Sequence, residues 1–330
     1  MTTLLSSVGT LVRRAGVPGV LLTIIVVALP LLLSDLRLNQ LTRQLVLVLA
    51  ILGVSMLTGR AGVVSLGHGV FVGIGAFATA SSAQAGVPLL LAVPVGIVVA
   101  AAFGVILGLP ALRVRGPHLA LITLGTALAF EPLAKKVPAY TGGSSGIRFD
   151  TSSFDAPSVF GGRDATAEWH YVVSLLVIAG WFVLARNLNN SRVGRAIQAT
   201  NDNEIAAATF GISARWAKTG ALGISAAMAG TGGALYAVLT SFLLSSEFDA
   251  LLSFRLYAAA VLGGVQSLAG PIYGIIVLVV VPEIAERISF LGNQDIVFGL
   301  AVVLVTLLAP GGAAEAIGRL RNLRGGRRVR

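Results

Sequence analysis

The sequence has no cysteine, which excludes disulfides, a thiol nucleophile and a cysteine-ligated metal site. It has only three histidines, and none lies within helical spacing of another, which argues against a histidine metal centre. Charged residues make up 12% of the 330 residues, about half of the roughly 25% in an average soluble domain. This composition excludes a soluble enzyme, and we expect neither catalytic residues nor a cofactor or a bound metal.

Apolar residues make up 55% of the chain, which also has 40 glycines and a mean hydropathy of +0.88. They form long runs without Asp, Glu, Lys or Arg. At roughly 20 residues per crossing, about ten crossings would use about 200 residues. The sequence therefore predicts an all-α polytopic membrane protein, a single transmembrane domain over 1–330 with glycine-broken segments. The predicted spans are 17–34, 43–58, 66–83, 88–110, 117–133, 169–186, 217–241, 252–268, 270–285 and 295–310.

The first of these spans is interpreted as a retained helix, because 17–34 is longer than a typical signal-peptide core and no small-x-small cleavage site follows it. A cytoplasmic N-terminus followed by ten spans places most basic residues on the cytoplasmic side. An even number of spans places the C-terminus there too. The basic tail 311–330 is interpreted as an electrostatic anchor on anionic lipid headgroups, with a partner site as the alternative.

Two predicted loops are too long and polar to be simple connections. The first, 134–168, is expected outside the membrane on the extracytoplasmic side. The second, 187–216, is expected in the cytoplasm. In it, Asn201, Asp202 or Asn203 can cap a short helix through Ile205, Ala206, Ala207 and Ala208 that Gly211 ends. Such a small apolar helix suits docking into a groove of another protein. The alternative is that it packs back on its own bundle.

The stretch 62–75 carries five glycines, which let helix backbones approach closely. Glycine-rich breaks inside a membrane are tolerated where they are buried or line an aqueous path. The candidate substrate-path residues are Ser65, His68, Thr123 and Gln266. The alternative for Ser65 and His68 is that they satisfy backbone groups at a tight helix crossing. We place 62–67 near the cytoplasmic end of a crossing.

An internal echo accompanies this stretch. The pattern Gly62-x-x-Ser65-Leu66-Gly67 recurs as Gly264-x-x-Ser267-Leu268-Ala269. Transporters often contain weak internal repeats with a binding site at their interface. Because glycine and leucine are abundant in this chain, a chance match is the alternative.

A resemblance to a known family follows from three stretches. Glu204, Ala206, Ala207 and Gly211 resemble the cytoplasmic coupling motif of ABC importer permeases, with Ile205 inserted after the glutamate. The stretches 59–77 and 193–212 resemble the branched-chain amino acid permease family specifically. Within that family, the segments 141–143 and 193–196 are similar to the M-type subunit. Together with weaker matches, the resemblance extends over about residues 55–275.

The resemblance implies a permease in a prokaryotic plasma membrane (the inner membrane where there are two) that is not itself an enzyme. No Gly-x-x-x-x-Gly-Lys-Ser/Thr pattern occurs in the chain, so the motor would be a separate polypeptide. The implied partners are two ATP-binding subunits, a second permease of H-type and an extracytoplasmic substrate-binding protein, with no nucleic acid. The implied ATPase-coupling residues are Arg195, Asn203, Glu204, Ile205, Ala206, Ala207 and Gly211.

The implied substrates are branched-chain amino acids, and relatives of the family carry urea, short amides or other amino acids. A different class remains open, a stand-alone ion-coupled transporter. That class needs ionisable groups inside the spans, yet the runs 61–112 and 219–246 contain no carboxylate. Uptake driven by an ion gradient without any ATPase would establish it.

Overall fold

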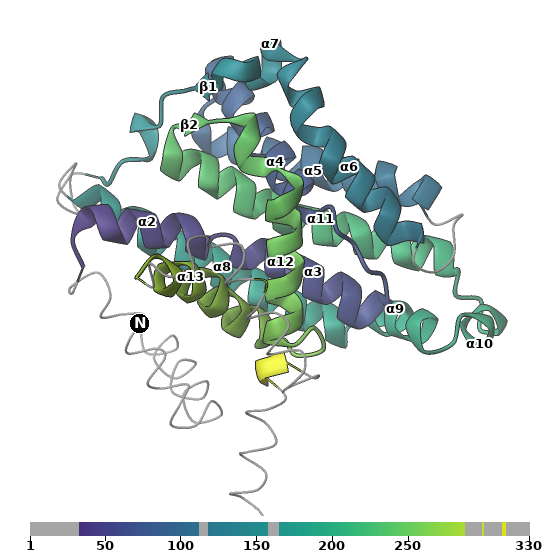
Figure 1. Cartoon of the computed structure of the whole chain (residues 1–330). Helices are drawn as coiled ribbons and strands as arrows, with labels where there is room; N and C mark the ends of the chain where they lie inside the picture. Colours follow the sequence, from purple (N-terminus) through teal and green to yellow (C-terminus); the bar gives the residue numbers. More distant parts are fainter. Residues whose placement is uncertain (1–32, 112–117, 158–164, 288–298, 300–311, 315–330) are drawn as a thin grey trace, which may run out of the picture.

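The computed structural model describes residues 33–111, 118–157, 165–287, 299 and 312–314. The predicted spans 17–34 and 295–310 and the basic tail 311–330 lie wholly or almost wholly outside these residues. The described chain is mostly helical, which confirms the all-α class (Figure 1). Its long helices are α2 Asp35–Leu45, α3 Val48–Ala61, α4 His68–Gln84, α5 Leu89–Ala111, α6 His118–Lys135, α8 Thr166–Asn190, α11 Ala214–Thr240, α12 Ala250–Gly263 and α13 Gly270–Arg287.

Within the described residues, four helical segments are long and apolar enough to cross a membrane. They are Asp35–Ala61, which joins α2 to α3, and Leu89–Leu109, Thr166–Asn190 and Ala214–Thr240. The chain is therefore a multi-pass membrane protein. One difference from the sequence prediction is α2, because 35–42 was expected as a loop. Leu38 explains the difference, since it is buried against Ala167 and Tyr171 of α8.

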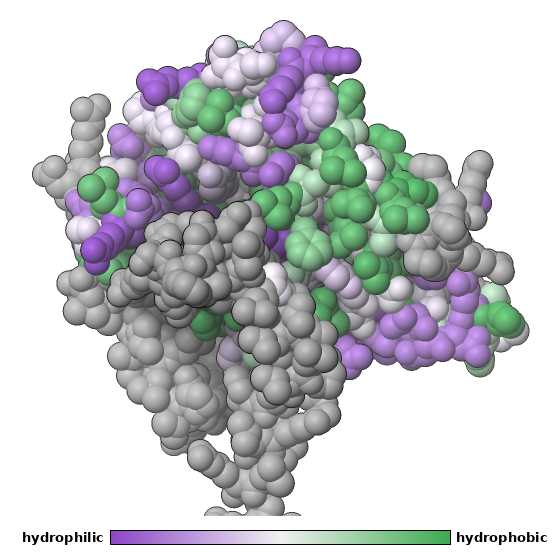
Figure 2. Space-filling model, viewed as in Figure 1, coloured by the Kyte–Doolittle hydropathy of each residue, from purple (hydrophilic) through white to green (hydrophobic). Residues whose placement is uncertain are grey.

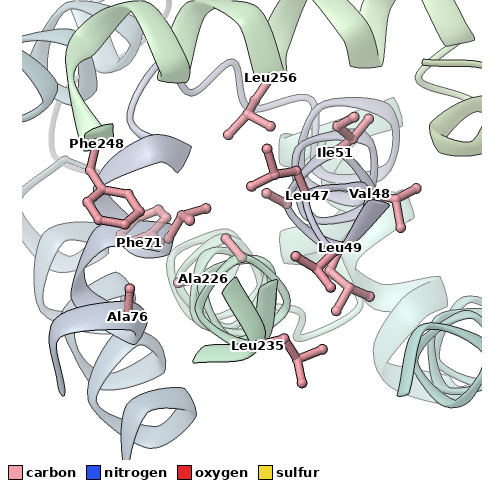
Figure 3. Packing of buried hydrophobic residues seen from close by; sticks show 14 of the residues in the cluster. Leu47, Val48, Leu49, Ile51, Phe71, Ala76, Ala226, Leu235, Phe248 and Leu256 are labelled. Carbon is pink, nitrogen blue, oxygen red and sulfur yellow. The ribbon is translucent and has the colours of Figure 1, made fainter. Parts of the chain in front are cut away.

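Helix α11 lies at the centre of the bundle and packs mainly against α3, α4 and α5. Figure 3 shows it between Ile51 of α3 and Phe71 of α4. Small residues allow this packing. A Cβ on Gly75 of α4 would overlap the backbone of Gly230, and a Cβ on Gly233 would overlap the carbonyl oxygen of Val72. Backbones therefore meet directly at these points along α11.

The predicted loop 134–168 is joined to the end of α11 by a small sheet. Strand β1, Ile147–Arg148, pairs antiparallel with β2, Phe242–Leu243. The short helix α7, Pro138–Thr141, precedes β1, and 3-10 turns cover Gly143–Ser145, Ser152–Phe154 and Ser245–Phe248. In Figure 1 this region lies at the opposite end of the bundle from α9, Arg192–Asp202, and α10, Glu204–Thr209. The two long loops of the sequence thus lie at opposite ends.

The close contact at Gly233 predicts a large difference between two glycines of the same helix. Gly233→Ala is expected to destabilise the protein by about 1–3 kcal/mol, because the added carbon overlaps the Val72 carbonyl. Gly220→Ala is the matched control, since a Cβ at Gly220 meets open space and alanine favours a helix. Thermal unfolding of the detergent-solubilised variants, followed by tryptophan fluorescence, measures both. Equal midpoints for the two variants would contradict the packing described.

Candidate functional site

The segment between α8 and α11 contains a short helix with a defined cap at each end. Of the three predicted capping residues, Asn203 is the cap: its Oδ1 accepts hydrogen bonds from the N–H groups of Ile205 and Ala206, both at 3.0 Å. At the other end Gly211 has a φ of +77°, a conformation that favours glycine. The N–H of Ile212 donates to the carbonyl of Ala207 at 3.1 Å, which completes a Schellman cap.

The two faces of α10 differ sharply. Ala207 is 3% exposed and packs towards the protein, whereas Ile205 is 82% and Phe210 84% exposed. The Glu204 carboxylate accepts from Lys218 Nζ of α11 at 3.1 Å, an exposed type of ion pair that contributes at most about 1 kcal/mol. Ala207 and the Glu204–Lys218 ion pair thus attach α10 to the rest of the chain, while Ile205 points away from it.

Helix α9 was not expected, since the sequence predicted only one short helix, through Ile205 to Ala208, in the loop 187–216. Ser191 caps it by accepting from the N–H of Gly194 at 3.1 Å, and Ile197 and Thr200 are buried. The Arg195 guanidinium donates to the carbonyl of Asn190 at 2.7 Å, which satisfies the end of α8. Helix α9 packs on α3, α8 and α11 and so carries α10 on a folded support.

Helix α9 also reaches the glycine-rich stretch that follows α3. A Cβ on Gly62 would overlap the side-chain oxygen of Asn201, so these two residues are in direct contact. Gly62 has a φ of +66° and ends α3. The segment 62–67 therefore begins beside α9.

That segment ends deep in the bundle, at the start of α4. His68 Nε2 lies 2.5 Å from Ser225 Oγ, a hydrogen bond to a residue about midway along α11. The N–H of Gly69 donates to Ser253 Oγ of α12 at 3.0 Å, and the N–H of Leu66 donates to Thr123 Oγ1 of α6 at 2.9 Å. Side chains of three helices thus surround the first turn of α4.

The two ends of 62–67 lie at different levels of the bundle. Only its Gly62 end lies beside α9, whereas its other end reaches the level of the middle of α11. The reason is that the chain is not helical here: α3 ends at Ala61, and an irregular segment then leads into the bundle to His68, where α4 begins. Helix α4 then runs alongside α11 towards β2, with Gly75 beside Gly230.

The predicted path residues separate into two places. Ser65, His68 and Thr123 come together and are at most 2% exposed. Gln266 is exposed and lies elsewhere, in the linker between α12 and α13, where it lines a small surface pocket with Arg60. Ser225 and Ser253 were not predicted as site residues. A serine inside an uncharged apolar run was the available signal, because polar groups at that depth need partners.

The internal echo has a structural counterpart. Each copy begins with a glycine at positive φ, +66° at Gly62 and +102° at Gly264, that ends a helix. In each, the serine hydroxyl accepts from the N–H two residues later, Ser65 from Gly67 at 3.4 Å and Ser267 from Ala269 at 3.2 Å. Both linkers then lead into a long helix, but the glycines differ in ψ, 20° at Gly62 and 99° at Gly264, so the two copies share the serine contact and not the whole backbone path.

No cluster of three or more potential metal ligands occurs within the described residues. The arrangement can transmit motion. Helix α10 exposes apolar side chains, α9 supports it, and α9 contacts the linker 62–67, which ends among buried hydroxyl groups and the His68 imidazole.

Comparisons with known proteins agree with the resemblance. Residues 36–306 match the model of a protein family described as the branched-chain amino acid transport system permease component. The high-affinity branched-chain amino acid transport system permease protein LivM of Escherichia coli is 31% identical over 318 residues, 89% of this chain and 73% of the relative. LivM of Salmonella typhimurium is 31% identical over 316 residues, 88% of this chain and 73% of the relative. No solved structure matches the chain. The chain therefore belongs to the family of branched-chain amino acid transport permease components.

Proposed function

We propose that this chain is the M-type permease subunit of an ABC importer that takes up branched-chain or related hydrophobic amino acids. It would form the path with an H-type permease, receive substrate from an extracytoplasmic binding protein and be driven by two ATP-binding subunits, in a prokaryotic plasma membrane. Its ten spans would leave both termini in the cytoplasm. The family and the similarity to LivM support the importer and the substrate class.

The observation that carries the proposal is the exposed apolar side of α10. Ile205 on α10 and Phe210, the residue at its C-cap, are more than four-fifths exposed, and the helix is capped and supported from behind. Exposed apolar groups of this kind on a rigid helix suit a groove in a partner. In our proposal the partner is an ATP-binding subunit. The docking element consists of the predicted coupling residues Arg195, Asn203, Glu204, Ile205, Ala206, Ala207 and Gly211.

One cysteine tests both the location and the docking of α10, because the chain has no natural cysteine. A cysteine in place of Ile205 is expected to resist an impermeant thiol reagent in intact cells, to react in inverted membrane vesicles, and to be protected when the ATP-binding subunits are present. Ser152→Cys, an exposed position in the region of β1, is the control and is expected to react in intact cells. Labelling of residue 205 from outside would contradict the proposal.

We further propose that motion of α10 reaches the path through α9. Asn201 of α9 touches Gly62, and the segment 62–67 leads to His68 beside Ser225. A displacement of α9 would move the start of α4 relative to α11. Such coupling needs nucleotide states that bind α10 differently, because equal affinity shifts no equilibrium.

Removing the Asn201 side chain is therefore expected to uncouple the two activities. Asn201→Ala would keep the ATPase rate of the reconstituted complex and lower uptake per ATP hydrolysed by about fivefold, within the range for residues along a coupling route. Asp202→Ala is the matched control. The Asp202 side chain is exposed, and within the described residues its carboxylate accepts a hydrogen bond only from Gln198 Nε2 of the same helix, at 2.9 Å. If both variants transport alike, the route through Asn201 is wrong.

We retain Ser65, His68, Thr123 and Gln266 as path residues, with the first three at the point where α4 begins. Thr123→Val keeps the shape of the side chain and removes the acceptor for the Leu66 N–H. Because we propose that the same hydroxyl also faces the substrate, its loss is expected to raise the substrate concentration for half-maximal uptake about fivefold, the size of one hydrogen bond. A lower thermal midpoint with an unchanged half-maximal concentration would instead assign Thr123 to packing alone.

A further inference from the structure

A cleft of about 510 Å³ opens between α4, α5 and α6, and none of the coupling-route residues Asn201, Gly62, His68 and Ser225 lines it. Phe77, Phe103 and Phe130 line it, one from each helix. Val95 and Val99 of α5 line it as well and are 39% and 41% exposed, so the cleft opens sideways from the bundle. Figure 2 shows hydrophobic residues gathered over the region where α6 lies in Figure 1. The cleft therefore opens onto a surface suited to the hydrocarbon of the bilayer.

The polar groups of the cleft lie near one end. Ser81 and Ser82 come from the last turn of α4, and Tyr140 and Thr141 come from α7. The lining of α4 runs from Ile74 to these serines, about 12 Å at 1.5 Å per residue. One leaflet of a bilayer has a hydrocarbon depth of about 15 Å, half of about 30 Å. The cleft thus has the length and the polarity gradient of a single leaflet, at the end of the bundle that carries α7.

The lining discriminates between occupants. The charged ends of an amino acid would find no ionised partner among the lining residues, and burying charges without partners is costly. A hydrocarbon chain requires no polar partner. At the polar end, Lys136 is exposed and directly precedes Val137, which lines the cleft. The neighbouring Lys135 is already paired with Glu131 at 2.7 Å, so at this end of the cleft Lys136 is a basic residue that can meet an anionic headgroup.

We propose that this cleft binds one acyl chain of an anionic phospholipid from the leaflet on the α7 side, with the headgroup phosphate near Lys136. The lipid fills the slot between α5 and α6 and completes the packing around Phe77. The site shares no lining residue with the predicted path residues Ser65, His68 and Thr123, and its occupancy does not depend on which solute the importer carries.

Photocrosslinking within the assembled importer tests this proposal. Benzoylphenylalanine replaces Val99, which lines the cleft, or Val98, which is 65% exposed and is not among the lining residues. Each complex is reconstituted in vesicles of phosphatidylglycerol and phosphatidylethanolamine, irradiated, and analysed by mass spectrometry of the intact chain. The expected result is a phospholipid adduct at position 99 that exceeds the adduct at 98 and is enriched in phosphatidylglycerol. Lys136→Gln is expected to reduce that enrichment about fivefold, the size expected for one basic residue beside anionic headgroups.

Three results would overturn the proposal. Equal lipid adducts at 99 and 98 would mean contact with bulk lipid only. A protein adduct at 99, with the mass of the second permease or of a second copy of this chain, would make the cleft a subunit interface. Enrichment unchanged by Lys136→Gln would remove the headgroup contact. Thermal midpoints of both benzoylphenylalanine variants within the range of the unmodified chain confirm that the fold is intact in each case.

Discussion

The close approach of backbones along α11 is the constraint on which the rest of the structure depends. Glycines 53, 75 and 104 of α3, α4 and α5 each face α11 at a distance that leaves no room for a Cβ. In a bilayer, helices gain little from excluding water, so association relies on such close packing and on interhelical hydrogen bonds. The short distances also place Ser225 within reach of His68. Packing and polar contacts are therefore parts of one arrangement.

The same constraint explains why the irregular segments can lie inside the bundle. Backbone groups that leave a helix at membrane depth need partners, since lipid supplies none. The start of α4 obtains them from Thr123 and Ser253, hydroxyls of two other helices. This makes the start of α4 the point where movements of α6, α11 and α12 would be felt together. A support such as α9, which touches the other end of that segment at Gly62, is well placed to act on it.

The two ends of the described bundle differ in what they offer. At one end, the sheet between Ile147 and Leu243 ties a long loop to α11. At the other, α10 leaves Ile205 exposed on a short capped helix. At the sheet, backbone groups of β1 and β2 are paired within the chain. Helix α10 leaves apolar surface without cover from the described chain, as expected for a surface that a partner would complete.

The sequence by itself determined the membrane class, the presence of a helix close to each predicted span between 43 and 285, and the short helix before Gly211. Those features depend on local composition: uncharged apolar runs, a capping asparagine and a glycine at positive φ. Only the tertiary structure decided that 35–45 is helical, that α9 is folded, and that Ser65, His68 and Thr123 meet while Gln266 lies apart. Contacts between residues such as His68 and Ser225, 157 positions apart, leave no local pattern, because they arise from how closely the helices pack.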